Sequence, residues 1–318
     1  MKKYILKRVL QAIPILFFVS ILSFLLMNLA PGNPAQAFIT VKMNPAQVAQ
    51  VKSSLGLDRP IPIRYINWLM NILHGNFGYS YITHQPVTEE ILARLPATVG
   101  LMGASMIISI IFAIPLGMIS AFKKNKFFDN CTTIISYIGI SIPSFWFALM
   151  LVILLSSKLK LLPSAGMHTI GVDSTLDVIK HSIMPCIVLS FPNIAVLTRY
   201  LRSSALNQFK EDYVITALSK GLSMKKVLYR HILKNSLLPL ITILGMSLPE
   251  LVSGAFITET IFGWPGMGKF GLNAVFNRDY PVIMATTMIS SILLILGNLI
   301  SDILYGILDP RIRVVNKH

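Results

Sequence analysis

Long apolar stretches alternate with polar segments along the whole chain. Each apolar stretch has the ~20 residues that an α-helix needs to cross ~30 Å of hydrocarbon. We therefore predict an all-α integral membrane protein with six transmembrane helices. The predicted spans lie near Val9–Ala30, Thr98–Phe122, Thr132–Ser157, Ser182–Tyr200, Ser236–Ile257 and Met284–Leu308.

The most distinctive polar segment is the basic loop Leu201–Pro239. Its pattern predicts two short helices, Gln208–Ser219 and Met224–Lys234, separated at Gly221, where a helix end favours a residue that tolerates positive φ. Ser223 is the expected N-cap of the second helix. On that helix Lys226, Arg230 and Lys234 recur every four residues, so they are expected to share one face.

Two helices of this length do not fold alone in water, so the loop must be braced by something else. One interpretation is an ordinary basic loop lying on anionic headgroups. The other is a docking element for a soluble partner. The length and helical pattern of the loop favour docking, because plain connectors are usually shorter.

Composition supports a membrane protein, since 54% of the 318 residues are hydrophobic and only 13% are charged. A net charge of +15 is also typical of nucleic-acid-binding proteins, but here the basic residues lie between apolar spans rather than on one soluble face, which excludes that interpretation. With the N-terminus inside, 18 of the 28 Lys and Arg residues fall on the cytoplasmic side. The positive-inside rule then places both termini and the basic loop in the cytoplasm of a cell-membrane protein.

The first span resembles a signal peptide in its basic start and in the small residues Ala35–Ala37. Its apolar run is longer than a typical signal core, so we interpret residues 1–31 as an uncleaved anchor helix. Residues 32–97 form an external loop region. Residues 98–318 form a five-helix core that carries the loop 201–239.

Two external segments carry helix and turn signals. Tyr65, Trp68, Leu69, Ile72 and Leu73 make an apolar stripe at helical spacing, which predicts an amphipathic helix on the outer leaflet or on another loop. In the last external loop, Trp264-Pro265-Gly266 predicts a tight turn. Trp264 and Phe262 suit an aromatic belt at the membrane interface, and a gate-lining role is the alternative.

The sequence contains no phosphate-binding loop, metal-ligand pattern or catalytic motif, so we expect no catalytic residue, no metal and no cofactor on this chain. Cys131 and Cys186 form no metal-ligand or disulfide pattern. Two acids lie within the predicted spans. Asp302 is expected to pair with Arg311 or Arg313, and Glu250 is either a cavity or gate residue or an acid paired with a neighbouring helix.

Taken together, a series of segments resembles the permease subunits of ABC importers, and most closely the dipeptide, oligopeptide and nickel branch. The loop carries "DYVITALSKGLSMKKVLYRHILKNSLLPLIT" at 212–242. In the family-wide loop signature, Glu-Ala-Ala-x3-Gly, the matching positions here are Ile215, Thr216, Ala217 and Gly221, so only the last two agree. The other matching segments are "APGNP" (30–34), "LGLDRPIPIRY" (55–65), "RLPAT" (94–98), "IPSFWFALML" (142–151), "LPSAG" (162–166), "TRYLRSS" (198–204), "FGWPGMG" (262–268), "NRDYPVIM" (277–284) and "DPRIR" (309–313).

This resemblance implies a type I importer permease fold and alternating access driven by other subunits. The implied partners are a second similar permease, two cytoplasmic ATPases that bind ATP and Mg, and an external substrate-binding protein. Peptides are the expected substrates, nickel or a metal chelate is the alternative within the family, and a membrane scaffold or sensor is the alternative outside it. The expected coupling residues are Asp212, Ala217, Gly221, Ser223, Lys226 and Arg230, and the candidate translocation-path or gate residues are Glu250, Trp264 and Pro265.

Overall fold

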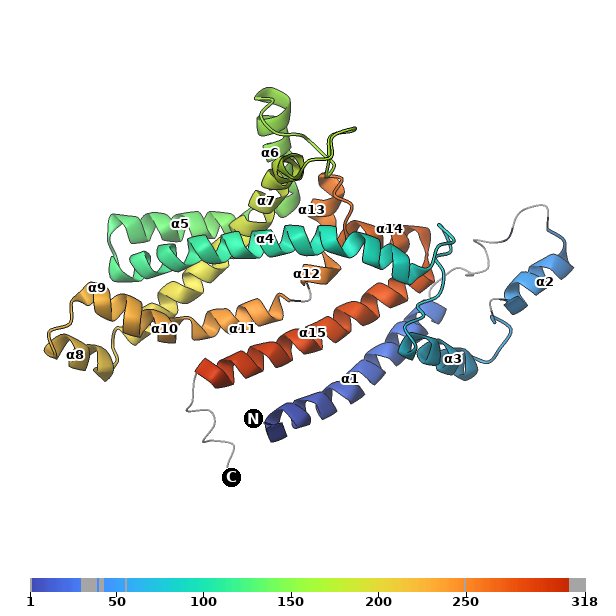
Figure 1. Cartoon of the computed structure of the whole chain (residues 1–318), viewed down its shortest axis with the longest axis horizontal. Coiled ribbons are helices and arrows are strands. Elements are labelled where there is room, and N and C mark those ends of the chain that lie inside the picture. Colours follow the sequence, from blue (N-terminus) through green and yellow to red (C-terminus); the bar gives the residue numbers. More distant parts are fainter. Residues whose placement is uncertain (1, 30–38, 40–42, 55, 249, 309–318) are drawn as a thin grey trace.

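A computed structural model describes the chain except residues 1, 30–38, 40–42, 55, 249 and 309–318 (Figure 1). The described residues form helices and loops, with a single antiparallel bridge between Tyr79 and Pro86. In chain order the helices are α1 (Lys2–Leu29), α2 (Pro45–Ser54), α3 (Ile61–Leu73), α4 (Val87–Phe122), α5 (Phe127–Ser141), α6 (Ser144–Leu151), the π-helical segment η2 (Val152–Lys158), α7 (Thr175–Gln208), α8 (Asp212–Ser219), α9 (Met224–Val227), the π-helical segment η3 (Leu228–Ile232), α10 (Leu233–Ser236), α11 (Leu238–Met246), α12 (Glu250–Ser253), α13 (Phe256–Ile261), α14 (Met267–Asn277) and α15 (Tyr280–Leu308).

Four helices in the described part of the chain are long and apolar enough to cross a membrane, and a bent pair makes up to five. The four lie in α1, α4, α7 and α15 and match four of the predicted spans. The predicted count of six is therefore not confirmed. α4 begins at Val87 rather than Thr98, so the predicted domain boundary at 97/98 falls inside this helix.

The third predicted span is not a straight helix. α5 and α6 meet at an angle of 100°. Ile142, which precedes Pro143, has an extended backbone with φ −73° and ψ 122°. Proline disfavours helical geometry in the residue before it and lacks an N–H donor, so the helix stops and restarts at this point.

The fifth predicted span, Ser236–Ile257, is also broken. α11 ends at Met246, the short α12 follows, and Gly254 adopts φ +74° before α13 begins. A left-handed residue of this kind ends a helix. The apolar composition of the segment predicted one continuous helix, and the breaks before α12 and at Gly254 show that this was wrong.

The centre of the molecule is the packing of α4 against α7. A Cβ on Gly117 of α4 would lie 3.0 Å from both the Cβ of Leu201 and the carbonyl oxygen of Thr198 on α7. Gly139 makes a similar close approach from α5, where an added Cβ would lie 3.1 Å from Ala195 Cβ. Small residues let these helix backbones come together, as is common between membrane helices.

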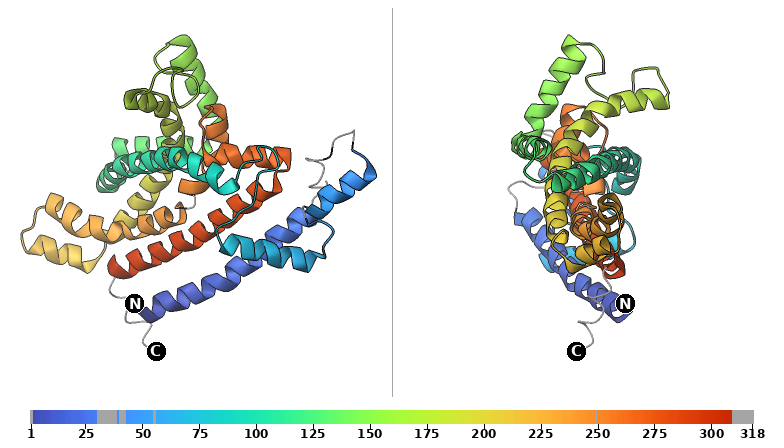
Figure 2. Two further views of the ribbon diagram at one scale, coloured as in Figure 1. Left: turned by 45° about the vertical axis from the view of Figure 1, so that its right-hand side comes forward. Right: turned by 90° about the vertical axis from the view of Figure 1, so that its left-hand side faces the viewer.

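α1 packs against α15 and α3, and the left view of Figure 2 shows α1 running beside α15 in the opposite direction. The predicted amphipathic helix is confirmed as α3. Its stripe faces α1: the Tyr65 hydroxyl lies 2.8 Å from Ser20 Oγ, and the rings of Tyr65 and Trp68 lie 5.4 Å and 5.7 Å from the buried ring of Phe24.

The ends of these helices gather at two ends of the molecule. The start of α1, the end of α15, the turn between α4 and α5, and α8 with α9 all lie toward one end (left in Figure 1). α3, the start of α4 and α14 lie toward the other. Candidate functional residues occur at both ends.

Candidate functional site

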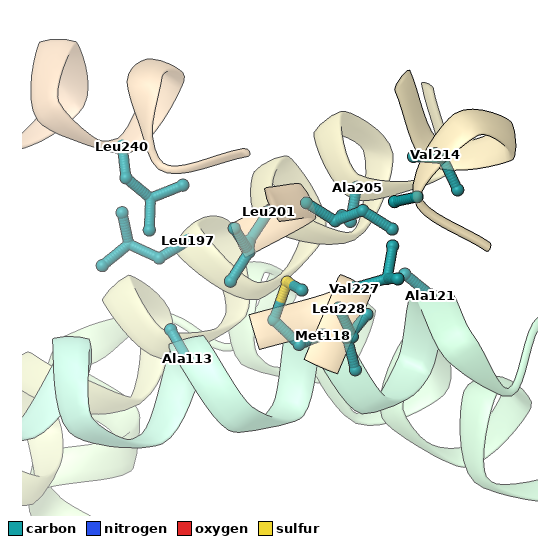
Figure 3. Close-up of a cluster of buried hydrophobic side chains, with 12 residues drawn as sticks. Ala113, Met118, Ala121, Leu197, Leu201, Ala205, Val214, Val227, Leu228 and Leu240 are labelled. Carbon is teal, nitrogen blue, oxygen red and sulfur yellow. The ribbon is translucent and has the colours of Figure 1, made fainter. Parts of the chain in front are cut away.

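The basic loop is braced by the membrane helices. Because α7 extends to Gln208, the part of this loop that lies outside the long helices is residues 209–237, which contain α8, α9, η3 and α10. We call this part the helical loop. Figure 3 shows one apolar cluster that joins the helical loop to the ends of α4 and α7. Its fully or almost fully buried members are Val214 and Ala217 of α8, Val227, Leu228 and Ile232 of the following turns, Ala113, Met118 and Ala121 of α4, Leu197, Leu201 and Ala205 of α7, and Leu240 of α11.

Gly221 forms the turn between α8 and α9 as the sequence predicted. Its φ is +78°, and its N–H donates to Leu218 O at 2.9 Å. The Leu222 N–H donates back to Ala217 O at 3.3 Å, which completes a Schellman motif. Leu222 also packs against the apolar cluster, so the local turn and the tertiary packing fix the same geometry.

Two predicted details of the loop are wrong, and a third feature was not predicted. α7 continues to Gln208, so the first loop helix begins at Asp212 rather than Gln208. Ser223 occupies the N-cap position of α9 but makes no side-chain capping bond. The second helix contains the π-helical turn Leu228–Ile232, which inserts an extra residue into the register and buries both of its end residues.

The outer face of the helical loop is exposed and chemically mixed. Asp212, Lys226 and Arg230 are exposed, whereas Ala217 is buried and supports the turn from inside. Large apolar side chains share this face, with Ile215 and Tyr229 about equally exposed at 60% and 59%. A helix pair with one face buried and an exposed face of apolar and basic side chains is suited to docking another protein.

A buried ion pair lies beside the helical loop and was not foreseen from the sequence. Asp129, in the first turn of α5, accepts two bonds from Arg202 of α7, at 2.5 Å to Nε and 2.7 Å to Nη2. The Ser120 hydroxyl of α4 and the Asn125 N–H (2.8 Å) also donate to this carboxylate. One acid therefore ties α4, α5 and α7 together close to the loop that they carry.

At the opposite end, Glu259 of α13 is fully buried and lies against the start of α14. The Thr98 hydroxyl of α4 donates to Glu259 Oε1 at 3.0 Å and accepts the Met267 N–H at 2.7 Å. The Lys269 N–H donates to Glu259 Oε2 at 2.9 Å, and the Gly268 N–H is a further donor. Thr98 and Glu259 thus satisfy the free N–H groups of the first turn of α14.

Glycines leave room for this carboxylate. A Cβ on Gly266 would lie 2.5 Å from the carboxyl carbon and both oxygens of Glu259. A Cβ on Gly268 would instead meet the backbone at the start of α13, 2.7 Å from the Phe256 N atom. We call Thr98, Glu259, Gly266 and Gly268, together with Trp264, the acid cluster. The sequence contained a usable signal for it, because an acid precedes the glycine-rich start of a helix by a few residues.

Trp264 is not part of an aromatic belt. It is only 2% exposed, and its indole N–H donates to Ala97 O of α4 at 3.0 Å. Phe262 is 1% exposed, so the interface expectation was wrong for both rings. Pro265, in the same turn, is exposed. The turn is consequently anchored to α4 through its tryptophan.

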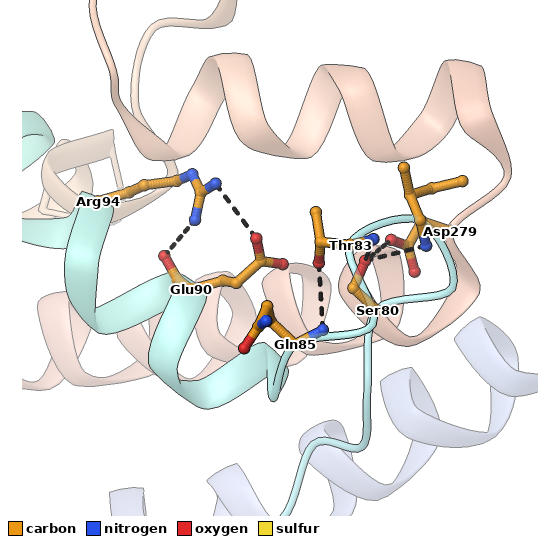
Figure 4. A network of polar contacts seen from close by, with 7 residues as sticks. Ser80, Thr83, Gln85, Glu90, Arg94 and Asp279 are labelled. Atoms are coloured by element: carbon orange, nitrogen blue, oxygen red, sulfur yellow. Dashed lines mark hydrogen bonds and ion pairs between the residues drawn. The ribbon is translucent and has the colours of Figure 1, made fainter.

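A polar network near the acid cluster fixes the loop before α4 (Figure 4). Asp279, between α14 and α15, accepts bonds from the Ser80 hydroxyl and from the Tyr81 N–H at 3.1 Å. Arg94 of α4 pairs with Glu90 at 3.3 Å and lies over the Phe270 ring at 4.2 Å. Three segments of the recognised pattern, 94–98, 262–268 and 277–284, therefore meet at this end.

Glu250 lies in a small hollow of about 40 Å³ between α4, α7, α11 and α12. Ser105, Ser109, Asn193 and Ser247 contribute polar atoms to the same hollow. Glu250 is exposed and has no ion pair with a described residue. The side chain of Asp302 and the arginines 311 and 313 lie outside the part of the chain that the structure describes.

The remaining ionisable groups in the described part of the chain form no further cluster that points to a metal site. Tyr213 of α8 donates to Gln208 Oε1 at 2.7 Å, and burial raises the pKa of its phenol. Within the described part of the chain, no three His, Cys, Asp or Glu side chains come close enough to hold a metal ion. The two ends therefore differ in kind, with an exposed face of apolar and basic side chains at one end and a turn anchored by a buried acid at the other.

Comparison with known proteins supplies the family. Residues 113–314 match the binding-protein-dependent transport system inner membrane component, and residues 1–102 match the N-terminal part of such a membrane component. The chain is 44% identical over 314 residues to the oligopeptide transport system permease protein AppB of Bacillus subtilis, covering 98% of this chain and 99% of that protein.

Other relatives are similar along their whole length. The chain is 37% identical over 333 residues to the di/tripeptide transport system permease protein DppB of Pseudomonas aeruginosa (98% of this chain, 99% of that protein). It is 36% identical over 332 residues to the dipeptide transport system permease protein DppB of Alkalihalophilus pseudofirmus (98% and 100%). The chain therefore belongs to the family of inner membrane components of binding-protein-dependent transport systems, and it is a multi-pass membrane transport subunit rather than an enzyme.

Proposed function

We propose that this chain is the permease subunit of an ATP-driven ABC importer for di- and oligopeptides. The observation that carries the proposal is the helical loop: its inner face is packed on α4 and α7, and its outer face is free to meet a partner. The relatives whose names specify peptides match essentially the whole chain, which supports peptides over nickel or a metal chelate.

The proposed orientation places both termini and the helical loop in the cytoplasm. The distribution of Lys and Arg favours it. The start of α1, the end of α15 and α8–α9 also lie toward one end of the molecule, as a single cytoplasmic side requires (Figure 1). The acid cluster and α3 then lie on the external side, where a substrate-binding protein delivers its cargo.

The partners are a second similar permease, two ATPases and an external binding protein. This chain carries no phosphate-binding loop, so ATP and Mg are bound by the ATPases and the work of transport enters from outside the chain. Shifting a two-state pore from 1:99 to 99:1 requires ~5.5 kcal/mol of differential binding. An ATPase that grips Gly221 and its flanking helices can supply this as a rigid-body movement of α4, α5 and α7.

Reconstituted transport tests the proposal. Vesicles that contain the complete set of subunits should take up a labelled tripeptide when ATP is supplied, and an excess of a nickel chelate should not compete. Uptake of the nickel chelate instead would assign the alternative substrate of the family. Absence of any ATP-dependent uptake would favour a scaffold or sensor.

A further inference from the structure

A depression of about 680 Å³ lies between α5 and α7. We call it the arginine groove. Its described lining consists of two arginines, two tyrosines, two hydroxyl side chains and two aliphatic side chains, and it contains no acid. A space of this size with positive charge and no negative charge of its own is suited to an anionic group.

α5 and α7 run in opposite directions along the groove, because early residues of α5 meet late residues of α7. Asp129, in the first turn of α5, holds Arg202 through its Nε and Nη2 atoms. About two turns further along α5, the centre of the Tyr137 ring lies 4.6 Å from Cζ of Arg199. Arg199 makes no ion pair with a described residue. Of the two arginines, Arg199 is therefore the one that can take an outside anion.

The groove changes from polar to apolar along its length. Thr133 and Ser203 lie at the end next to the buried ion pair of α5 and α7. Arg199 lies in the middle. Ile140 and Val196 lie at the far end. A phospholipid has its groups in the same order, because the polar headgroup and its phosphate are followed by acyl chains.

The polar end of the groove lies at headgroup depth. The turn between α4 and α5 carries Lys123, Lys124 and Lys126, which are all exposed. Thr133 follows Lys126 by about two helical turns, which is ~10 Å along α5. The polar layer on each side of the hydrocarbon is about 5–8 Å thick. With these lysines among the headgroups, Thr133 therefore lies close to the boundary with the acyl chains, and Arg199 lies just within reach of a phosphate.

We propose that the arginine groove binds an anionic phospholipid, with its phosphate on Arg199 and an acyl chain along Ile140 and Val196. A guanidinium holds a phosphate through two parallel N–H bonds while its flat face stays on an aromatic ring, here that of Tyr137. The bound phosphate also offsets the cost of an unpaired arginine in a membrane span. In the orientation proposed above, the lipid belongs to the cytoplasmic leaflet, whose surface is negative.

A helix of a second permease is the competing occupant, because an acid on that helix can also pair with an arginine. The side chains of α5 favour lipid. Contacts between membrane helices are enriched in small residues, and Gly139 of α5 is already used against Ala195 of α7. Elsewhere α5 exposes the bulky side chains of Ile134 and Ile138. Such a surface is typical of contact with acyl chains.

Photocrosslinking in the assembled transporter identifies the occupant. A photoreactive phenylalanine analogue replaces Tyr200, which lines the groove and is 53% exposed. The complex is irradiated in vesicles of phosphatidylglycerol and phosphatidylcholine. The expected product is an adduct with the mass of phosphatidylglycerol, in excess of its share of the bilayer. A crosslink to the second permease, or lipid adducts in proportion to the bilayer composition, would overturn the proposal.

Lipid titration of the solubilised complex tests the role of Arg199. Native mass spectrometry should show that Arg199→Gln lowers the affinity for phosphatidylglycerol about fivefold, as expected for one basic contact with an anionic lipid. Arg199→Lys should keep most of the affinity. Lys124→Gln removes an exposed positive charge at the same end but outside the groove, and should bind lipid normally. Normal binding by Arg199→Gln, or an equal loss in Lys124→Gln, contradicts the assignment.

Two controls define the ligand. Phosphatidylcholine should not replace phosphatidylglycerol, and inorganic phosphate should not displace it. Displacement by inorganic phosphate would assign the groove to a free anion and overturn the lipid site. Neither the crosslinking nor the titration needs ATP or a peptide, so the importer function is tested separately from this site.

Discussion

Replacing Gly221 by valine tests whether the turn between α8 and α9 transmits the work of an ATPase. A Cβ at this position meets nothing within 4 Å, so the substitution causes no clash with neighbours. Its cost comes from the backbone, because φ is +78° and a left-handed conformation costs an L-residue ~1–2 kcal/mol. A β-branched side chain lies at the upper end of this range.

The turn can relieve about 2 kcal/mol of strain by giving up the Leu222 N–H bond to Ala217 O, which holds α9 against α8. At 1.4 kcal/mol per tenfold, the population of the native turn then falls about thirtyfold relative to alternatives. The expected result is a large drop in peptide uptake per ATP hydrolysed, while the apolar cluster keeps the protein folded. Both rates are measured in one preparation of proteoliposomes.

Two variants serve as controls. Gly221→Asn should retain most coupling, because asparagine tolerates positive φ. Gly171→Val introduces the same strain at φ +83°, also with no atom within 4 Å, in a turn before α7 far from the helical loop. If Gly221→Val couples normally, or if Gly171→Val uncouples equally, the reasoning about the turn is wrong.

Four further variants test stability and fluorescence. Asp129→Asn leaves the Arg202 guanidinium without its counter-charge. Because the arginine is partly exposed, the free energy of unfolding should fall by about 2–3 kcal/mol, as measured by thermal unfolding in detergent. Glu259→Gln places an amide against N–H donors and should lower the free energy of unfolding by about 1–3 kcal/mol. Gly266→Ala crowds the same carboxyl group and should lower the unfolding temperature to a similar extent. Trp264→Phe should remove the blue-shifted part of the tryptophan emission and cost about 1 kcal/mol for the lost bond to a carbonyl.

Each of these has a matched control. Glu211→Gln and Glu89→Gln remove exposed acids and should leave the unfolding temperature unchanged. Trp146→Phe removes an indole that is 48% exposed and makes no hydrogen bond with a described residue, so it should leave the unfolding temperature unchanged. An unaltered melting curve for Asp129→Asn would mean that the ion pair is dispensable, and an unshifted spectrum for Trp264→Phe would contradict its burial.

Local signals predicted local structure well. Gly221, its left-handed φ and the helix on either side could be read from the sequence because a Schellman turn depends on a few consecutive residues. The four long helices followed from hydropathy. Pro143 and Gly254 can be read in the sequence as helix-breaking residues. The apolar runs around them nevertheless predict continuous spans, because hydropathy does not show where a helix is interrupted.

Contacts between distant segments could be read only in part. Glu259 lies shortly before the glycine-rich start of α14, which is a local signal, but its partner Thr98 and the Asp129–Arg202 pair depend on tertiary packing. Glu259 and Thr98 are 161 residues apart, and Asp129 and Arg202 are 73 apart. The general preference of tryptophan for membrane interfaces predicted an exposed Trp264. Its indole is instead buried, because its N–H donates to the carbonyl oxygen of Ala97 on α4. Only tertiary packing decides which polar residues meet.

The 36 residues of α4 have a mechanical consequence. At ~1.5 Å per residue the helix is ~54 Å long, well beyond the ~30 Å of hydrocarbon. It touches the helical loop near Met118 and the acid cluster at Thr98. A rod that tilts about a point near its middle swings its two tips in opposite directions. If α4 tilts in this way during transport, its two ends move together, so opening on one side of the bilayer and closing on the other come from a single movement.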